Sequence, residues 1–102
     1  MSEPKPLDLS GCDHLLEGAS EFLRMWNRAG GPVICFVDPY PVGADPFGFG
    51  LALMDCVGHG ANAYAQALGI PVADAMARIL EGFDAERENP TDIPTSLTEG
   101  KH

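Results

Sequence analysis

The sequence is poor in basic residues: six Lys or Arg stand against fifteen Asp or Glu, which gives a formal net charge of −9. Nucleic-acid binding depends on clustered Lys and Arg side chains that neutralise phosphates, and the sequence has no such cluster. The same charge disfavours docking to an anionic membrane surface. The composition therefore predicts an acidic protein that binds neither nucleic acid nor membranes. Its negative charge would suit a basic partner, a cation or simple solubility.

Long apolar runs and paired cysteines are lacking as well. No apolar stretch approaches the roughly 18 residues that a membrane-spanning helix needs, and the N-terminus has no basic region followed by an apolar run, as a secretory signal would. Cys12, Cys35 and Cys56 fall in three different kinds of segment, which argues against a disulfide framework and a paired zinc motif. We expect reduced thiols and a cytoplasmic location.

The short motifs that mark common enzymes are also missing. The chain contains no GxGxxG, GxxxxGK[ST], GxSxG or HExxH sequence, so the usual nucleotide-binding, hydrolase and zinc-protease signatures are absent. The sequence predicts no cofactor, no metal and no catalytic residue. These absences argue against enzymatic activity without deciding the question.

What is present is one small domain between two loose ends. A chain of 102 residues holds a single domain. Residues 1–19 are rich in proline, glycine and acidic residues and are expected to form a flexible arm, with a brief extended or helical piece at 13–17. Residues 20–89 carry the α+β domain. Residues 90–102 have too little apolar content to fold alone and are expected to form a flexible tail.

A β-hairpin is predicted first, because two apolar, partly β-branched runs flank Ala29-Gly30-Gly31. A two-residue turn would place four residues on one face: Leu23, Met25, Ile34 and Phe36. The other face would hold Phe22, Arg24, Trp26, Val33, Cys35 and Val37. Both faces are rich in apolar side chains, and a hairpin cannot leave both in water.

Two helices are predicted next. Asp45-Pro46 is a helix start, with an N-cap and a proline at the first position. Apolar residues then recur at steps of three and four until Gly69, a left-handed stop. The second helix is expected from about Pro71 to Glu88, with an ion pair between Asp74 and Arg78 on its surface.

The first of these helices has a polar face that holds Asp55, His59 and Asn62. A carboxylate and an imidazole one turn apart could bind a divalent metal or orient a general base. A zinc site needs three or four ligands, however, and the sequence offers no strong third one. The alternative is an ordinary solvated face, and we predict no metal here.

A third line on this helix contains only small residues: Ala52, Cys56, Gly60, Ala63 and Ala67. Small residues at helical spacing let another backbone approach closely. Because free cysteine is commonly buried, we expect Cys56 to lie in a packed interior.

The best candidate for a contact surface is a patch formed by Arg24, Trp26 and Tyr40. These residue types are enriched at the energetic centres of protein interfaces. Packing in the core or in a dimer is the competing role for Trp26.

The combination of "LRMW", "GG", a second apolar strand, "HGANAYA" and "RILEGFDAERENPTD" resembles a small family of bacterial proteins, domain of unknown function 5076. The likeness spans about residues 21–92. It implies a β-hairpin followed by helices, and it implies no activity, cofactor or site residue. At the turn, Ala29 stands where asparagine would suit better.

Together these observations predict an α+β fold, with an antiparallel β-hairpin in β-β-α-α order packed on two antiparallel helices. An isolated two-stranded ribbon is marginally stable at best, so we expect a homodimer that completes the sheet, with hairpins joined edge to edge or face to face. A third strand at residues 7–9 is the competing way to cover the edge.

The expected function is a small non-enzymatic protein-interaction or regulatory module that acts as a homodimer. The alternative is a small-molecule or metal-binding protein, which could be an enzyme, using the polar face of the first long helix.

Overall fold

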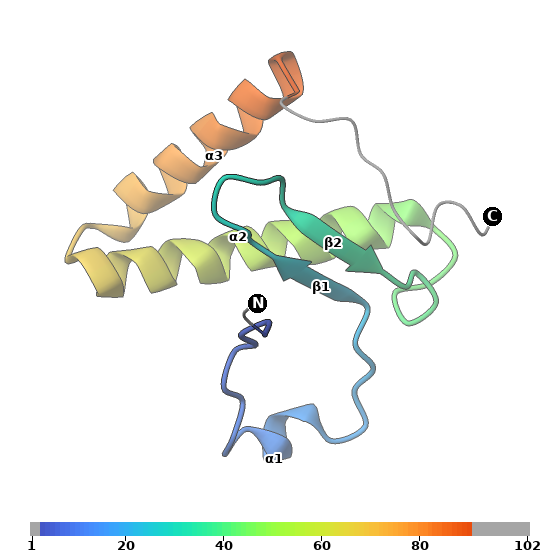
Figure 1. Ribbon diagram of the computed structural model, residues 1–102. Helices are drawn as coiled ribbons and strands as arrows, with labels where there is room; N and C mark the ends of the chain where they lie inside the picture. Colours follow the sequence, from blue (N-terminus) through green and yellow to red (C-terminus); the bar gives the residue numbers. More distant parts are fainter. Residues whose placement is uncertain (1–2, 91–102) are drawn as a thin grey trace.

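The computed structural model describes residues 3–90. Along the chain its elements are α1 (Asp13–Leu16), β1 (Leu23–Trp26), β2 (Ile34–Val37), α2 (Pro46–Leu68) and α3 (Val72–Glu88). The two strands form an antiparallel hairpin, and the two long helices pack on each other (Figure 1). The predicted α+β class and the order of hairpin and helices are confirmed.

The bounds of α2 follow from the capping residues that the sequence supplies. The carboxylate of Asp45 accepts a hydrogen bond from the backbone N–H of Phe47 at 3.0 Å, and Pro46 occupies the first turn. The helix ends at Gly69, whose φ of 68° is left-handed. A short connection then turns the chain into α3, so the two helices form a V (Figure 1).

The buried part of the described chain is a narrow seam between α2 and α3. Val57 and Ala61 on α2 and Ala75 on α3 are its buried residues. Gly60 lies beside them, and a Cβ at this position would meet Cδ1 of Ile79 at 3.9 Å, an ordinary van der Waals distance. Small residues therefore let the helices approach, but little apolar surface is covered.

The hairpin has a different register from the one predicted. Its pairs are Leu23 with Val37, Arg24 with Phe36, Met25 with Cys35, and Trp26 with Ile34. The loop closes through a hydrogen bond from the N–H of Gly31 to the carbonyl of Arg28, with Gly30 at a φ of 74°. Because Pro32 has no N–H, the strand ladder cannot extend to this turn. The bond closes a turn centred on Ala29-Gly30, but the strands pair in a register that encloses three residues, so the register predicted for a two-residue turn is wrong.

The changed register moves the side chains of β2 to the opposite faces. One face of the hairpin carries Leu23, Met25, Cys35 and Val37, and the other carries Phe22, Arg24, Trp26, Ile34 and Phe36. A one-residue difference in register exchanges the two faces of a strand, because successive side chains alternate. The predicted partition is wrong for this reason, although both faces remain rich in apolar residues.

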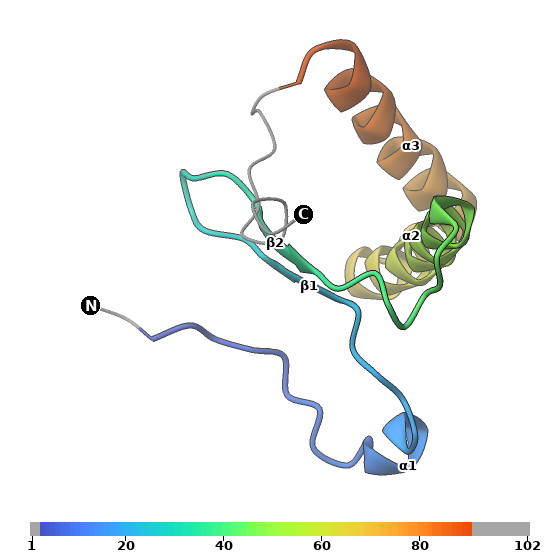
Figure 2. The same cartoon turned by 90° about the vertical axis from the view of Figure 1, so that its right-hand side faces the viewer.

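The segment before the hairpin lies on the side of β1, whereas α3 lies on the side of β2 (Figures 1 and 2). It contains α1, so the brief helical piece expected near residues 13–17 is present. Residues 7–9 form no strand, and the sheet of the described chain consists of β1 and β2. The tail predicted from residue 90 falls outside the described residues from position 91 onward. Within residues 3–90, no helix is both long and apolar enough to cross a membrane.

Candidate functional site

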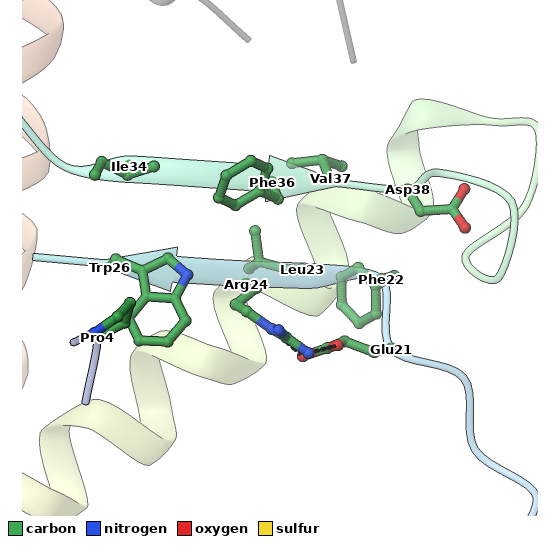
Figure 3. A pocket seen from close by; sticks show the side chains of 10 residues that line it. All are labelled: Pro4, Glu21, Phe22, Leu23, Arg24, Trp26, Ile34, Phe36, Val37 and Asp38. Atoms are coloured by element: carbon green, nitrogen blue, oxygen red, sulfur yellow. Dashed lines mark hydrogen bonds and ion pairs between the residues drawn. The ribbon is translucent and has the colours of Figure 1, made fainter. Parts of the chain in front are cut away.

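An open groove of about 720 Å³ lies along the hairpin, mainly on the face that carries Trp26 and Phe36 (Figure 3). It is lined by Pro4, Glu21, Phe22, Leu23, Arg24, Trp26, Ile34, Phe36, Val37 and Asp38. Its apolar wall comes from the face that carries Trp26 and Phe36, and Figure 3 shows Pro4 beside the indole of Trp26. We refer to this hollow as the hairpin groove.

The charged groups of the hairpin groove lie at its edge. Arg24 donates two hydrogen bonds to Glu21: Nε donates to Oε2 at 3.0 Å, and Nη2 donates to Oε1. The hydrogen bond from Arg24 lowers the pKa of the Glu21 carboxyl below its ordinary value. Both side chains are more than half exposed, so this pair orients the guanidinium and contributes little to stability.

Asp38 lies at the end of β2 and fixes the chain as it leaves the hairpin. Its backbone N–H donates to the carbonyl of Phe22 at 2.9 Å, and its carboxylate accepts from the N–H of Tyr40 at 3.2 Å. Asp38 and Glu21 therefore place two carboxylates around a largely apolar hollow that contains one guanidinium. A ligand with an apolar body and a positive charge would complement this arrangement.

Of the predicted contact patch, the structure brings Arg24 and Trp26 into the same groove. Tyr40 is 88% exposed and does not line it. Sequence reasoning missed Phe36 and Ile34 as neighbours of Trp26, because they share its face only in the observed register. Pro32 excludes a turn centred on Gly30-Gly31, which would need its N–H, but it fits a turn centred on Ala29-Gly30, so the sequence carries no clear signal for the observed register.

The three residues of the predicted polar face all lie on α2, as expected. Asp55, His59 and Asn62 are all exposed, and no hydrogen bond or ion pair joins them. Within residues 3–90, no group of three His, Cys, Asp or Glu side chains is placed to hold a metal ion. The role of these residues in binding stays a prediction.

The cysteines are free, and Cys56 is exposed. Its predicted place in a packed interior is wrong for the single chain, because α3 packs against the line of Val57 and Ala61. The small-residue line that holds Cys56 meets this seam at Gly60 and leaves Cys56 exposed. Which face of a helix is covered depends on the neighbouring helix, and the spacing within α2 does not contain that information.

No curated protein matches the chain. One solved structure, described as "Structure of a putative pyruvate dehydrogenase from the photosynthetic bacterium Rhodopseudomonas palustrus CGA009", is similar to it, with 34% sequence identity and a TM-score of 0.63. The similarity covers 93% of this chain and 95% of that chain. Residues 15–91 match the family described as Domain of unknown function (DUF5076). This match includes the hairpin and both long helices, and the chain therefore belongs to the DUF5076 family.

Proposed function

We propose that this protein is a small non-enzymatic interaction module that acts as a homodimer. The observation that carries the proposal is its nearly absent core: Val57, Ala61 and Ala75 are the buried apolar residues of the described chain. Meanwhile α2 leaves large apolar side chains exposed, namely Phe47, Leu51, Met54, Tyr64 and Leu68. Burying a side chain of this size contributes about 1.5–3 kcal/mol, so a second copy that covers several of them would stabilise both.

The surface area supports the same proposal. The chain exposes 8972 Å², whereas a compact monomer of 10.8 kDa would expose about 5,500 Å². The difference of roughly 3,500 Å² is larger than the roughly 800 Å² that each partner contributes to a standard interface. The excess surface is therefore sufficient for a stable dimer.

In this proposal the hairpin groove supplies the contacts with a further protein. Arg24 and Trp26 belong to the residue types that dominate binding energy at interfaces. The chain carries a net charge of −9, and two carboxylates lie at the groove, so a basic segment is the favoured partner. We place the protein in the cytoplasm, where its three free cysteines would stay reduced.

No contact among the described residues favours the alternative, a small-molecule or metal-binding protein that uses Asp55, His59 and Asn62.

Concentration-dependent unfolding tests the proposal. A chain that folds as it dimerises gains about 2.7 kcal/mol of apparent stability for each hundredfold rise in protein concentration. We expect the urea midpoint, followed by far-UV circular dichroism, to rise with protein concentration over that range. A midpoint that does not depend on protein concentration would contradict the homodimer.

A further inference from the structure

The outer edge of β1 carries unpaired backbone groups. The N–H of Asp38 donates to the carbonyl of Phe22 at 2.9 Å, which fixes the alternation of the antiparallel ladder. The backbone groups of Arg24 and Trp26 therefore point toward β2, and those of Leu23 and Met25 point outward. No strand of the described residues lies on that edge. Figure 1 shows β1 as the outer strand, on the side away from α3.

A second copy of the chain is the partner that this edge fits best. An open edge is a template for another strand, and two hairpins joined through β1 would form the four-stranded sheet that a lone hairpin lacks. Twofold symmetry makes equal strands run antiparallel. The excess exposed area is large enough for such an interface.

The side chains of β1 select one register among four. Because Leu23 and Met25 point outward, the symmetric pairing can be centred on any of the four residues of β1. A centre at Arg24 would place two like charges directly opposite each other, which is destabilising. A centre at Leu23 or at Trp26 would bring only that one residue of β1 opposite a residue of the partner's β1, so most of the strand would lie outside the contact.

A centre at Met25 avoids both problems. It pairs Arg24 with the partner's Trp26, and by symmetry Trp26 with the partner's Arg24, at the closely spaced positions of the ladder. A guanidinium over the face of an indole is a favourable cation–π contact. Arg24 is already oriented by Glu21 on the face that also carries Trp26.

We propose that β1 of two copies pairs antiparallel about Met25, so that Arg24 of each copy completes the hairpin groove of the other by lying against its Trp26. This inference rests on the proposed homodimer and adds its interface and register. It makes the hairpin groove a site built from two chains, in which Arg24 and Trp26 contact the second copy and the carboxylates of Glu21 and Asp38 remain for the proposed basic partner.

Disulfide trapping at position 25 tests the register. In a background with C12S, C35A and C56S, Met25→Cys places two thiols across the twofold axis, where paired Cα atoms lie about 5.5 Å apart, within the range of a disulfide. Arg24→Cys serves as the comparison, because position 24 faces position 26 in this register. We expect mild oxidation to convert most of the Met25→Cys protein to a covalent dimer and little of the Arg24→Cys protein.

Sedimentation of the same samples distinguishes a failure of the register from a failure of the homodimer. A dimer that is not trapped through position 25, or that is trapped better through position 24, overturns the register and leaves the homodimer standing. A monomer overturns both.

The native chain provides a second readout that needs no cysteine replacement. Trp26 is the single tryptophan. The wavelength of its fluorescence emission therefore reports how far the second copy shields its indole from water. We expect a red shift as dilution dissociates the dimer. A dimer that dissociates with no change in Trp26 emission overturns the inference.

Discussion

The rings of Phe22 and Phe49 meet edge to face, with centroids 6.2 Å apart and ring planes at 80°. Phe22 directly precedes β1, and Phe49 lies in the first turns of α2. The contact therefore ties the entry of the hairpin to the start of the long helix. Such aromatic pairs contribute about 0.5–1.5 kcal/mol beyond the area that they bury.

We expect Phe22→Ala and Phe49→Ala to be coupled. A double-mutant cycle in urea should give a coupling free energy of about 0.5–1.5 kcal/mol, because each replacement removes the same ring contact. Phe22→Ala combined with Phe83→Ala is the control, since Phe83 is on α3 and makes no ring contact with Phe22. Equal coupling in the two cycles would mean that the Phe22–Phe49 contact is not formed.

Gly58 and Gly69 should respond in opposite directions to alanine. A Cβ at Gly58 would meet nothing within 4 Å, so Gly58→Ala should stabilise α2 by about 1 kcal/mol through its higher helix propensity. Gly69 has a φ of 68°, which L-residues adopt reluctantly, so Gly69→Ala should destabilise the protein by about 1 kcal/mol. Urea unfolding at one protein concentration measures both, and the same sign for the two variants would contradict the assigned helix end.

The carboxyl of Glu21 should titrate below its ordinary range because Arg24 hydrogen-bonds to its charged form. A lowered folded-state pKa stabilises the fold above the unfolded-state pKa, and this contribution is lost as pH falls through the folded-state value. Both groups are exposed, so the effect on stability is small. NMR titration should show the pKa of Glu21 rising toward its ordinary value in Arg24→Gln.

Asp8 is the internal control for that titration. Hydrogen bonds from Ser10 lower its pKa, and these do not involve Arg24. An unchanged pKa of Glu21 in Arg24→Gln, or an equal rise at Asp8, would show that the guanidinium is not the cause.

Asp55→Ala and His59→Ala should leave the fold and the dimer intact. Both side chains are exposed and make no hydrogen bond or ion pair among the described residues, so the free energy of unfolding should change by less than about 0.5 kcal/mol. Binding of a small molecule or a metal that either replacement abolishes, in a protein that still folds, would favour the alternative function.

The helices were predictable because their determinants are local. Asp45 and Gly69 act within a few residues of the helix ends that they define. The ion pair on the surface of α3 was harder to predict. Arg78 donates a hydrogen bond to Glu81 at 2.8 Å, whereas the sequence predicted Asp74 as its partner. Arg78 can reach an acidic residue one helical turn before it or one turn after it. Because an exposed ion pair contributes little free energy, spacing alone does not determine which partner it takes.

The hairpin groove could be predicted only in part. Arg24 and Trp26 stand out by residue type, but their neighbours on β2 depend on whether the loop has an even or an odd number of residues. The sequence does not decide this: Pro32 excludes a turn centred on Gly30-Gly31, but a turn centred on Ala29-Gly30 needs no N–H at position 32. Residues of α2 and α3 that meet across the seam were also beyond the sequence pattern, since periodicity identifies apolar stripes without identifying their partners.

The molar mass in solution tests the central claim most directly. Sedimentation equilibrium at micromolar concentration should give twice the chain mass of 10.8 kDa, because the proposed dimer covers large apolar side chains that the single chain exposes. A mass of 10.8 kDa under the same conditions, in a protein that is fully folded by circular dichroism, would contradict the homodimer.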